Sequence, residues 1–129
     1  YINREHPNHV KLLGQIQKKE YDQMVACCDV GLVFLDHRFT IPNFPSRLLS
    51  YMQAGLPVLA CTDSSTDIGR VITDGNFGWW CESNDVMGFM NCIYVVSKPN
   101  TEVFRDRSFL YLTENYNVTS VVEKIGLSI

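Results

Sequence analysis

Short runs of apolar residues alternate along this chain with segments in which apolar residues recur every three or four positions. Such runs are typical of strands, whereas the three-to-four spacing is typical of helices with one buried face. The predicted strands cover residues 9–13, 30–35, 58–60 and 77–81. The predicted helices cover residues 18–28, 46–54, 83 or 84 to 97, 102–115 and 118–125, and a short helix turns Ile68, Val71 and Ile72 inward.

The order of these elements predicts an α/β fold with one domain. Strands that alternate with helices pair in parallel, and the helices then cover both faces of the sheet. Val30 to Leu35 is almost wholly apolar, which is typical of a parallel strand covered on both faces. We therefore expect a three-layer sandwich with a parallel sheet and with Val30 to Leu35 as a central strand.

The most specific pattern lies between Asn43 and Ala60, in the stretch NFPSRLLSYMQAGLPVLA. Pro45 and Ser46 are expected to open a short helix that ends at Gly55, before a buried strand. The start of a helix carries unpaired N–H groups and the positive end of a dipole, so it attracts phosphate. Ser46, Arg47 and Ser50 collect at this start, and an arginine can hold a phosphate with two parallel hydrogen bonds.

A structural interpretation of the same residues stays open at this point. Ser46 can be an N-cap, Arg47 a solvated charge and Gly55 a C-cap. Under both interpretations Leu48, Leu49 and Met52 lie on the opposite side of the helix, where a sheet would cover them.

Composition narrows the class of protein. Of the 129 residues 46% are hydrophobic, which allows a buried core, and a net charge of −3 without a basic run argues against nucleic acid as a partner. The five cysteines show no C-x-x-C spacing, and the histidines show no metal-ligand spacing, so free thiols in a reducing compartment and no metal are expected. No apolar run approaches the ~18 residues of a membrane span.

The 43–60 stretch resembles the hallmark region of retaining glycosyltransferases with the GT-B fold, the group 1 or family 4 type. The family pattern ends in L-E-A-M-A-x-G-x-P-V-I-A, and this chain matches it at Leu49, Met52, Ala54, Gly55, Pro57, Val58 and Ala60. Two family glutamates fall on Pro42 and Ser50. The run from Pro45 to Tyr51 matches the P-S-K/R-L-L-S-Y variant of bacterial surface-polysaccharide transferases instead.

The resemblance implies that residues 1–129 form one domain, a fragment equivalent to the second half of the Rossmann-like C-terminal domain of these enzymes. That domain binds the nucleotide-sugar donor, here expected to be a UDP-sugar, and no cofactor or metal is implied. The implied donor-binding residues are Gly14, Gln15, Phe44, Pro45, Ser46, Arg47 and Ser50. The turn at Gly14 would lie against the base, the loop 36–44 would meet the sugar, and Ser50 would face the ribose. No catalytic residue is assigned, because both family glutamates are absent.

The whole enzyme would transfer a sugar to an acceptor hydroxyl in polysaccharide or glycan biosynthesis. A glycan or lipid-linked acceptor would bind through an N-terminal domain that has no counterpart here, so the fragment is expected to be inactive alone. A cytoplasmic location is implied, at the inner face of the membrane if the full-length enzyme associates peripherally with it. Two alternatives remain: a non-catalytic flavodoxin-like interaction module, and a GT-B nucleotide-sugar epimerase.

Overall fold

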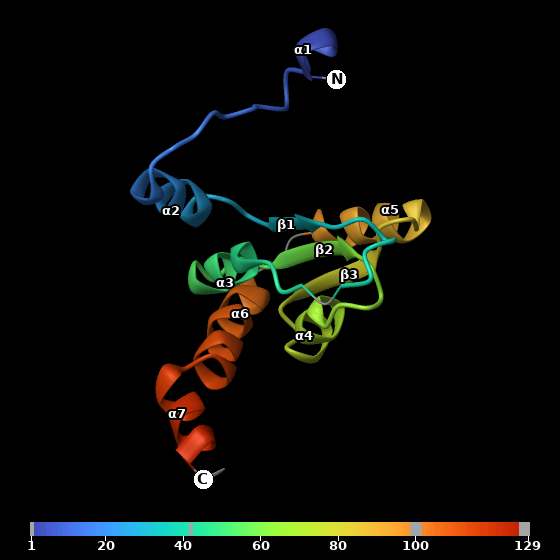
Figure 1. Ribbon diagram of the computed structural model, residues 1–129. Coiled ribbons are helices and arrows are strands. Elements are labelled where there is room, and N and C mark those ends of the chain that lie inside the picture. The colour runs from blue at the N-terminus through green and yellow to red at the C-terminus, as the bar shows by residue number, and fades with distance from the viewer. Residues whose placement is uncertain (1, 42, 99–101, 127–129) are drawn as a thin grey trace.

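The computed structural model describes residues 2–41, 43–98 and 102–126. Its parallel sheet has the order β1-β2-β3, with β1 at Gly31–Phe34, β2 at Val58–Thr62 and β3 at Gly78–Glu82 (Figure 1). Helix α3 (Ser46–Gln53) connects β1 to β2, and α4 (Ile68–Asp74) connects β2 to β3. The predicted α/β class with a parallel sheet is confirmed.

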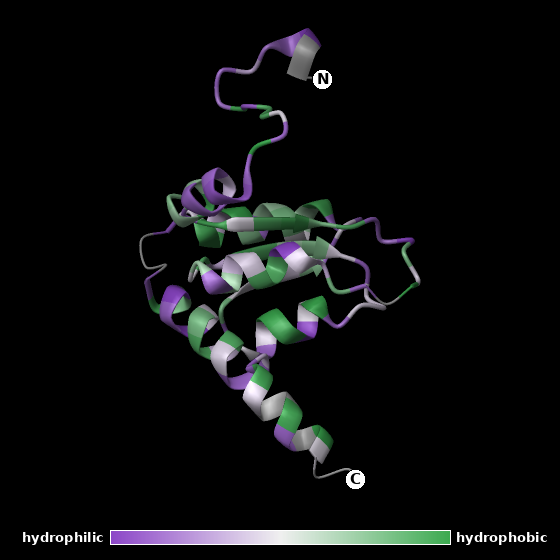
Figure 2. Ribbon diagram, turned by 60° about the vertical axis from the view of Figure 1, so that its left-hand side comes forward, coloured by the Kyte–Doolittle hydropathy of each residue, from purple (hydrophilic) through white to green (hydrophobic). Residues whose placement is uncertain are grey.

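The remaining helices lie around and beyond this sheet. They are α1 (Ile2–Glu5), α2 (Lys18–Ala26), α5 (Val86–Val96), α6 (Glu102–Asn115) and α7 (Val118–Gly126). Helix α6 packs beside α3, and α7 leads away from the sheet (Figure 1). The strands are largely hydrophobic, whereas the segment that precedes α2 is largely hydrophilic and extends away from the domain (Figure 2).

The core consists of two clusters, one on each face of the sheet, because successive side chains of a strand point to opposite faces. Helices α3 and α4 cover the first face, whose fully buried residues are Val33, Leu48, Met52, Val58, Ala60, Ile68, Ile72 and Phe77. Helix α5 covers the second face over Leu59, Cys61 and Cys81. All five residues of β2 are buried, so β2 is the centre of the three-layer sandwich.

Helix α3 follows its predicted course. Leu48 and Met52 are fully buried on the sheet side. The helix ends at Gly55, whose φ of +67° suits glycine. The Gly55 N–H donates to Met52 O at 3.0 Å and the Leu56 N–H donates to Tyr51 O at 2.9 Å, which is the Schellman arrangement. This turn directs the chain into β2.

Two predictions at the N-terminal side of the sheet are wrong. Residues 9–13 form no strand, and Val10, Leu12 and Leu13 are largely exposed. Consequently Val30 to Leu35 contains the edge strand of the described sheet, not its central strand, and Leu32 and Phe34 are 43% and 52% exposed. An apolar run becomes a strand only where a neighbouring strand pairs with its N–H and C=O groups. Residues 9–13 pair with none of the described strands, and the outer edge of β1 stays unpaired in the described sheet.

Smaller differences concern the ends of helices. Helix α2 stops at Ala26, two residues before the predicted end. Helix α5 is capped by Asp85, whose carboxylate accepts from the Gly88 N–H at 2.8 Å, and not by Ser83 or Asn84. The predicted break at residues 99–100 lies outside the described residues.

The closest backbone approach in the sheet gives a test of the fold. A Cβ added at Gly78 would lie 2.0 Å from the Val58 carbonyl oxygen. Because backbone cannot yield as a side chain can, we expect Gly78→Ala to lower the free energy of unfolding by ~1–3 kcal/mol in urea titrations. The control is Gly126→Ala, because nothing lies within 4 Å of its added Cβ. Equal effects of the two substitutions would contradict the β2–β3 pairing.

Candidate functional site

The candidate site lies where α3 begins. The loop that leads into α3 leaves the carboxyl edge of the sheet at the end of β1 and runs back along the sheet to the start of the helix (Figure 1). Parallel α/β sheets bind ligands at this edge, because the loops there converge from several strands. Five of the seven predicted donor-binding residues, from Phe44 to Ser50, belong to this one segment.

The start of α3 has no side-chain cap. Pro45 occupies the N-cap position with φ −65° and ψ 125°, and it makes no side-chain capping hydrogen bond. Ser46 is therefore the first helical residue, and its interpretation as an N-cap is wrong. The Leu48 N–H donates to Pro45 O at 2.9 Å. No acceptor from the described part of the chain reaches the Ser46 or Arg47 N–H groups, which leaves them available to an anion.

Two arginines, Arg38 in the loop after β1 and Arg47 on α3, differ in whether their side chains have a hydrogen-bond partner. Arg38 donates to the Asp36 carboxylate through Nε at 2.9 Å and Nη2 at 2.6 Å. These side-chain hydrogen bonds hold the pKa of Asp36 well below its usual value. Arg47 is exposed, and within residues 2–41, 43–98 and 102–126 its side chain forms no hydrogen bond or ion pair. Arg47 therefore keeps all its donors for a ligand.

The side chain of Ser50 lies one helical turn beyond Ser46 and lines a cleft between α2 and α3. This cleft has a volume of about 230 Å³, and its walls are Asp22, Val25, Ala26, Ser50, Gln53 and Ala54. Ser50 is half-buried, whereas Ser46 is exposed. The two hydroxyls thus stand on one side of the helix, at different depths.

Gly14 and Gln15 lie in the extended segment before α2 and are exposed. Nothing lies within 4 Å of a Cβ added at Gly14, so the structure does not bring this residue into contact with the start of α3. Their role against a base stays a prediction. Pro42, on which the first family glutamate falls, lies outside the described residues.

An aromatic contact that the sequence does not predict holds the loop before α3. The Phe44 ring lies 5.7 Å from the Tyr116 ring at the end of α6, and Tyr116 lies 6.4 Å from Tyr111. Tyr111 in turn lies 5.4 Å from the fully buried Phe77. Burial raises the pKa of Tyr116 above its ordinary value. No local pattern links Phe44 and Tyr116, because they come from distant segments.

A second polar region follows the carboxyl end of β2. Asp63 is buried, and its Oδ1 accepts from the Ser65 and Thr66 N–H groups at 2.8 Å each. The Trp80 indole N–H donates to the Thr62 hydroxyl at 2.9 Å. A hollow of about 280 Å³ lies beside this turn, with walls formed by Ser64, Thr66, Gly69, Arg70, Thr73 and Trp80.

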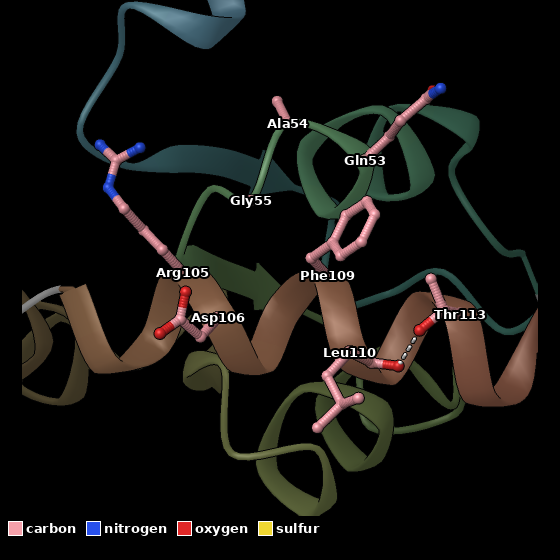
Figure 3. A pocket seen from close by; sticks show the side chains of 8 residues that line it. All are labelled: Gln53, Ala54, Gly55, Arg105, Asp106, Phe109, Leu110 and Thr113. Atoms are coloured by element: carbon pink, nitrogen blue, oxygen red, sulfur yellow. Dashed lines mark hydrogen bonds between the residues drawn. The ribbon is translucent and has the colours of Figure 1, made fainter.

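A larger hollow of about 590 Å³ lies between α3 and α6 (Figure 3). Its walls are Gln53, Ala54, Gly55, Arg105, Asp106, Phe109, Leu110 and Thr113. The Arg105 guanidinium donates to Cys28 O at 2.9 Å, so it is already engaged. Because Gly55 precedes β2, this hollow lies toward the amino end of the strand. It is therefore not part of the candidate site.

Neither a metal centre nor a membrane span is found in the portion of the chain that the structure describes. No group of three or more His, Cys, Asp or Glu side chains there could hold a metal ion. None of the helices described is both long and apolar enough to cross a bilayer.

The cysteines are free thiols, as expected. Cys61 on β2 and Cys81 on β3 are buried, and their sulfur atoms lie 3.4 Å apart. Burial raises the pKa of Cys61 and Cys92, and it raises the pKa of Cys81 to about 11. Cys27 is exposed at the end of α2. The buried thiols are packing groups with little thiolate character.

Comparison with known proteins gives one relative. The chain is 26% identical over 117 residues to a probable glycosyltransferase, WbjE, of Pseudomonas aeruginosa. The match covers 91% of this chain and 29% of the relative, so the chain spans less than a third of the relative's length. No family model matches the chain. No solved structure matches it.

The thiols make the packing of the sheet testable. A thiol reacts as its thiolate, so a raised pKa and burial both slow labelling. At pH 8 we expect Ellman's reagent to label Cys27 quickly in the native protein and to label Cys61 and Cys81 only after unfolding. Removal of the fast phase by Cys27→Ser identifies its source. Labelling of Cys81 at the rate of Cys27 would contradict the described core.

Proposed function

We propose that this chain binds the nucleotide-sugar donor of a retaining glycosyltransferase with the GT-B fold. The observation that carries the proposal is the start of α3, where N–H groups without a side-chain cap stand beside the Ser46 hydroxyl and the Arg47 guanidinium, which has no hydrogen-bond or ion-pair partner among the described residues. The similarity to a probable glycosyltransferase across 91% of the chain supports the reaction class. The match to the P-S-K/R-L-L-S-Y variant supports the placement of the donor at this helix.

The proposed chemistry is the departure of a nucleoside diphosphate. The bond between the sugar C1 and the β-phosphate oxygen breaks, a bond from C1 to the acceptor hydroxyl oxygen forms with retained configuration, and the hydroxyl proton passes to the leaving diphosphate. Negative charge grows on the leaving diphosphate as the first bond breaks. Donors that are already aimed at this charge lower the barrier without reorganising. Arg47 and the N–H groups of α3 supply such donors, and Ser46 adds a hydrogen bond to a phosphate oxygen.

The remaining donor contacts follow from the same placement. Ser50, one turn along α3, would face the ribose. Because serine is shorter than the glutamate found at this position in the family, a water molecule would bridge Ser50 and the ribose. Phe44 would lie beside the sugar, on a loop that Tyr116 holds against α6. Gly14 and Gln15 would reach the base after the segment before α2 moves against the sheet.

The identity of the substrates is part of the proposal. We infer a UDP-sugar as donor and a glycan or lipid-linked acceptor, which would bind on a further domain of a longer enzyme. Such an enzyme would act in the cytoplasm in polysaccharide or glycan biosynthesis, with any membrane association being peripheral. The donor-binding residues, not a metal, are proposed to neutralise the diphosphate.

Arg47 provides the direct test of the donor site. A hydrogen bond between charged groups contributes ~1.5–3 kcal/mol, so we expect Arg47→Ala to weaken UDP binding by about 10- to 150-fold. Arg47→Lys should recover only part of this loss, because lysine keeps the charge but not the two parallel donors. Isothermal titration calorimetry of the folded variants with UDP measures both effects.

The matched control is Arg107→Ala, because Arg107 is an exposed arginine of α6 beside a groove formed with α4. This variant should bind UDP as the unsubstituted protein does. Equal UDP affinities for the unsubstituted protein and for Arg47→Ala would place the diphosphate elsewhere and would remove the main support for the proposal.

A second test concerns catalysis by the 129 residues alone. Placement of donor and acceptor accounts for much of the rate of such a reaction, and the proposed acceptor site is on another domain. We therefore expect weak UDP binding and no sugar transfer from a UDP-sugar to a hydroxyl acceptor in a radiolabel assay. Transfer above the rate of a heat-denatured sample would show that the acceptor site lies within this chain.

A further inference from the structure

The hollow beside the turn after β2 has the size and lining of a small binding site. Its volume of about 280 Å³ lies just below the ~300–1000 Å³ of pockets that hold drug-sized ligands. It lies beside the turn that follows the carboxyl end of β2, and none of its lining residues belongs to α3. The donor site of the proposed function therefore does not account for it.

One wall of the hollow is a fixed aromatic ring. The Trp80 indole N–H donates to the Thr62 hydroxyl at 2.9 Å, which sets the orientation of the ring. A Cβ added at Gly69 would lie 2.8 Å from three atoms of the indole, so the missing side chain lets α4 approach the ring directly. Trp80 is half-buried, and part of its surface remains open to the hollow.

The other walls carry hydrogen-bonding groups. Thr73 Oγ1 donates to Gly69 O at 2.8 Å and can still accept a hydrogen bond from a ligand. The Arg70 side chain is 75% exposed, and its Nη2 lies 3.5 Å from Asp67, which leaves most of its donors open to a ligand. The hydroxyls of Ser64 and Thr66 complete this lining.

We propose that this hollow binds one hexopyranose unit of the acceptor glycan, at a distance from the unit whose hydroxyl reacts, which is proposed to bind on the further domain. The C–H groups of a pyranose ring pack on an aromatic surface, and its hydroxyls need both donors and acceptors around their rim. The hollow offers both in a volume suited to a single ring. The choice of ligand rests on the proposed glycosyl transfer, whereas the site itself is separate from the donor site at α3.

The indole N–H signal of Trp80 can report on binding in the hollow, and the indole N–H signal of Trp79 serves as a control in the same spectrum. Trp79 points to the other face of the sheet, where its ring lies 4.6 Å from that of Phe104. In ¹H–¹⁵N spectra of the 129-residue protein, the two indole N–H signals are assigned with Trp79→Phe. We expect methyl α-D-glucopyranoside, mannopyranoside or galactopyranoside to shift the Trp80 signal in a saturable manner, at millimolar concentrations. The Trp79 signal should stay in place.

Arg70→Ala tests the polar rim without disturbing the core, because the side chain is exposed. Loss of its hydrogen bonds to sugar hydroxyls should weaken the binding of the methyl hexoside by about 5- to 10-fold. Arg107→Ala, the exposed arginine on α6, should leave the affinity unchanged. Equal affinities for Arg70→Ala and the unsubstituted protein would overturn the assignment.

The remaining outcomes separate this site from the donor site. If none of the three methyl hexosides shifts the Trp80 signal, or if Trp79 and Trp80 shift alike, the proposal fails. Arg47→Ala should weaken the binding of UDP and leave the binding of the hexoside unchanged. If the hexoside binds and UDP does not, only the proposed donor site is refuted. If UDP binds and no hexoside does, only the hexose site is refuted.

Discussion

The enclosure of β2 on both faces and along both edges is the constraint on which the other elements depend. Its N–H and C=O groups have no access to water, so β1 and β3 must pair with them in register. Its side chains need apolar cover on both faces, which α3 and α4 provide on one side and α5 on the other. A fully buried valine or leucine side chain contributes ~1.5–3 kcal/mol, so Val58 and Leu59 of β2 stabilise the fold through both faces of the sheet.

The close approach of neighbouring elements to β2 and its partners requires very small residues. Gly78 brings β3 against Val58, and a Cβ added at Gly31 would lie 2.4 Å from the ring of Tyr51 on α3. At the amino end of β2 the Ser108 hydroxyl donates to Leu56 O at 3.0 Å and fastens α6 to the turn that follows α3. These contacts bring β1, β3 and α6 close to the amino end of β2.

The carboxyl end of β2 is arranged differently. There Asp63 satisfies two backbone N–H groups of the following turn, so the chain can leave the sheet without a buried unpaired group. Polar side chains and open surface then remain on the turn and on the start of α3.

The sequence allows those features to be predicted that depend on neighbouring residues. The bounds of α3, its buried face and its end at Gly55 all follow from spacing and from the preference of glycine for positive φ. The first family glutamate falls on Pro42, and the sequence offers no substitute for it. The candidate residues from Phe44 to Ser50 could be placed together because they form one continuous segment.

Features that need a distant partner could not be predicted in this way. Residues 9–13 have the composition of a strand, but a strand exists only with a second strand beside it. The edge position of β1 follows from that missing pairing. The contact of Phe44 with Tyr116 and the hydrogen bond of Trp80 with Thr62 join segments without a shared local pattern. Each becomes visible only when the chain is folded.

Neighbouring residues of α3 face opposite sides of the helix, so the residues proposed to bind the ligand differ from those that stabilise the fold. Leu48 is fully buried against the sheet, whereas the adjacent Arg47 is exposed and unengaged among the residues described. A charge that must act on a leaving group works best when the backbone beneath it is rigid. The buried face of α3, the turn at Gly55 and the ring contact of Phe44 fix that backbone at three points. Substitution of Leu48 would therefore act through the fold, and substitution of Arg47 through the ligand alone.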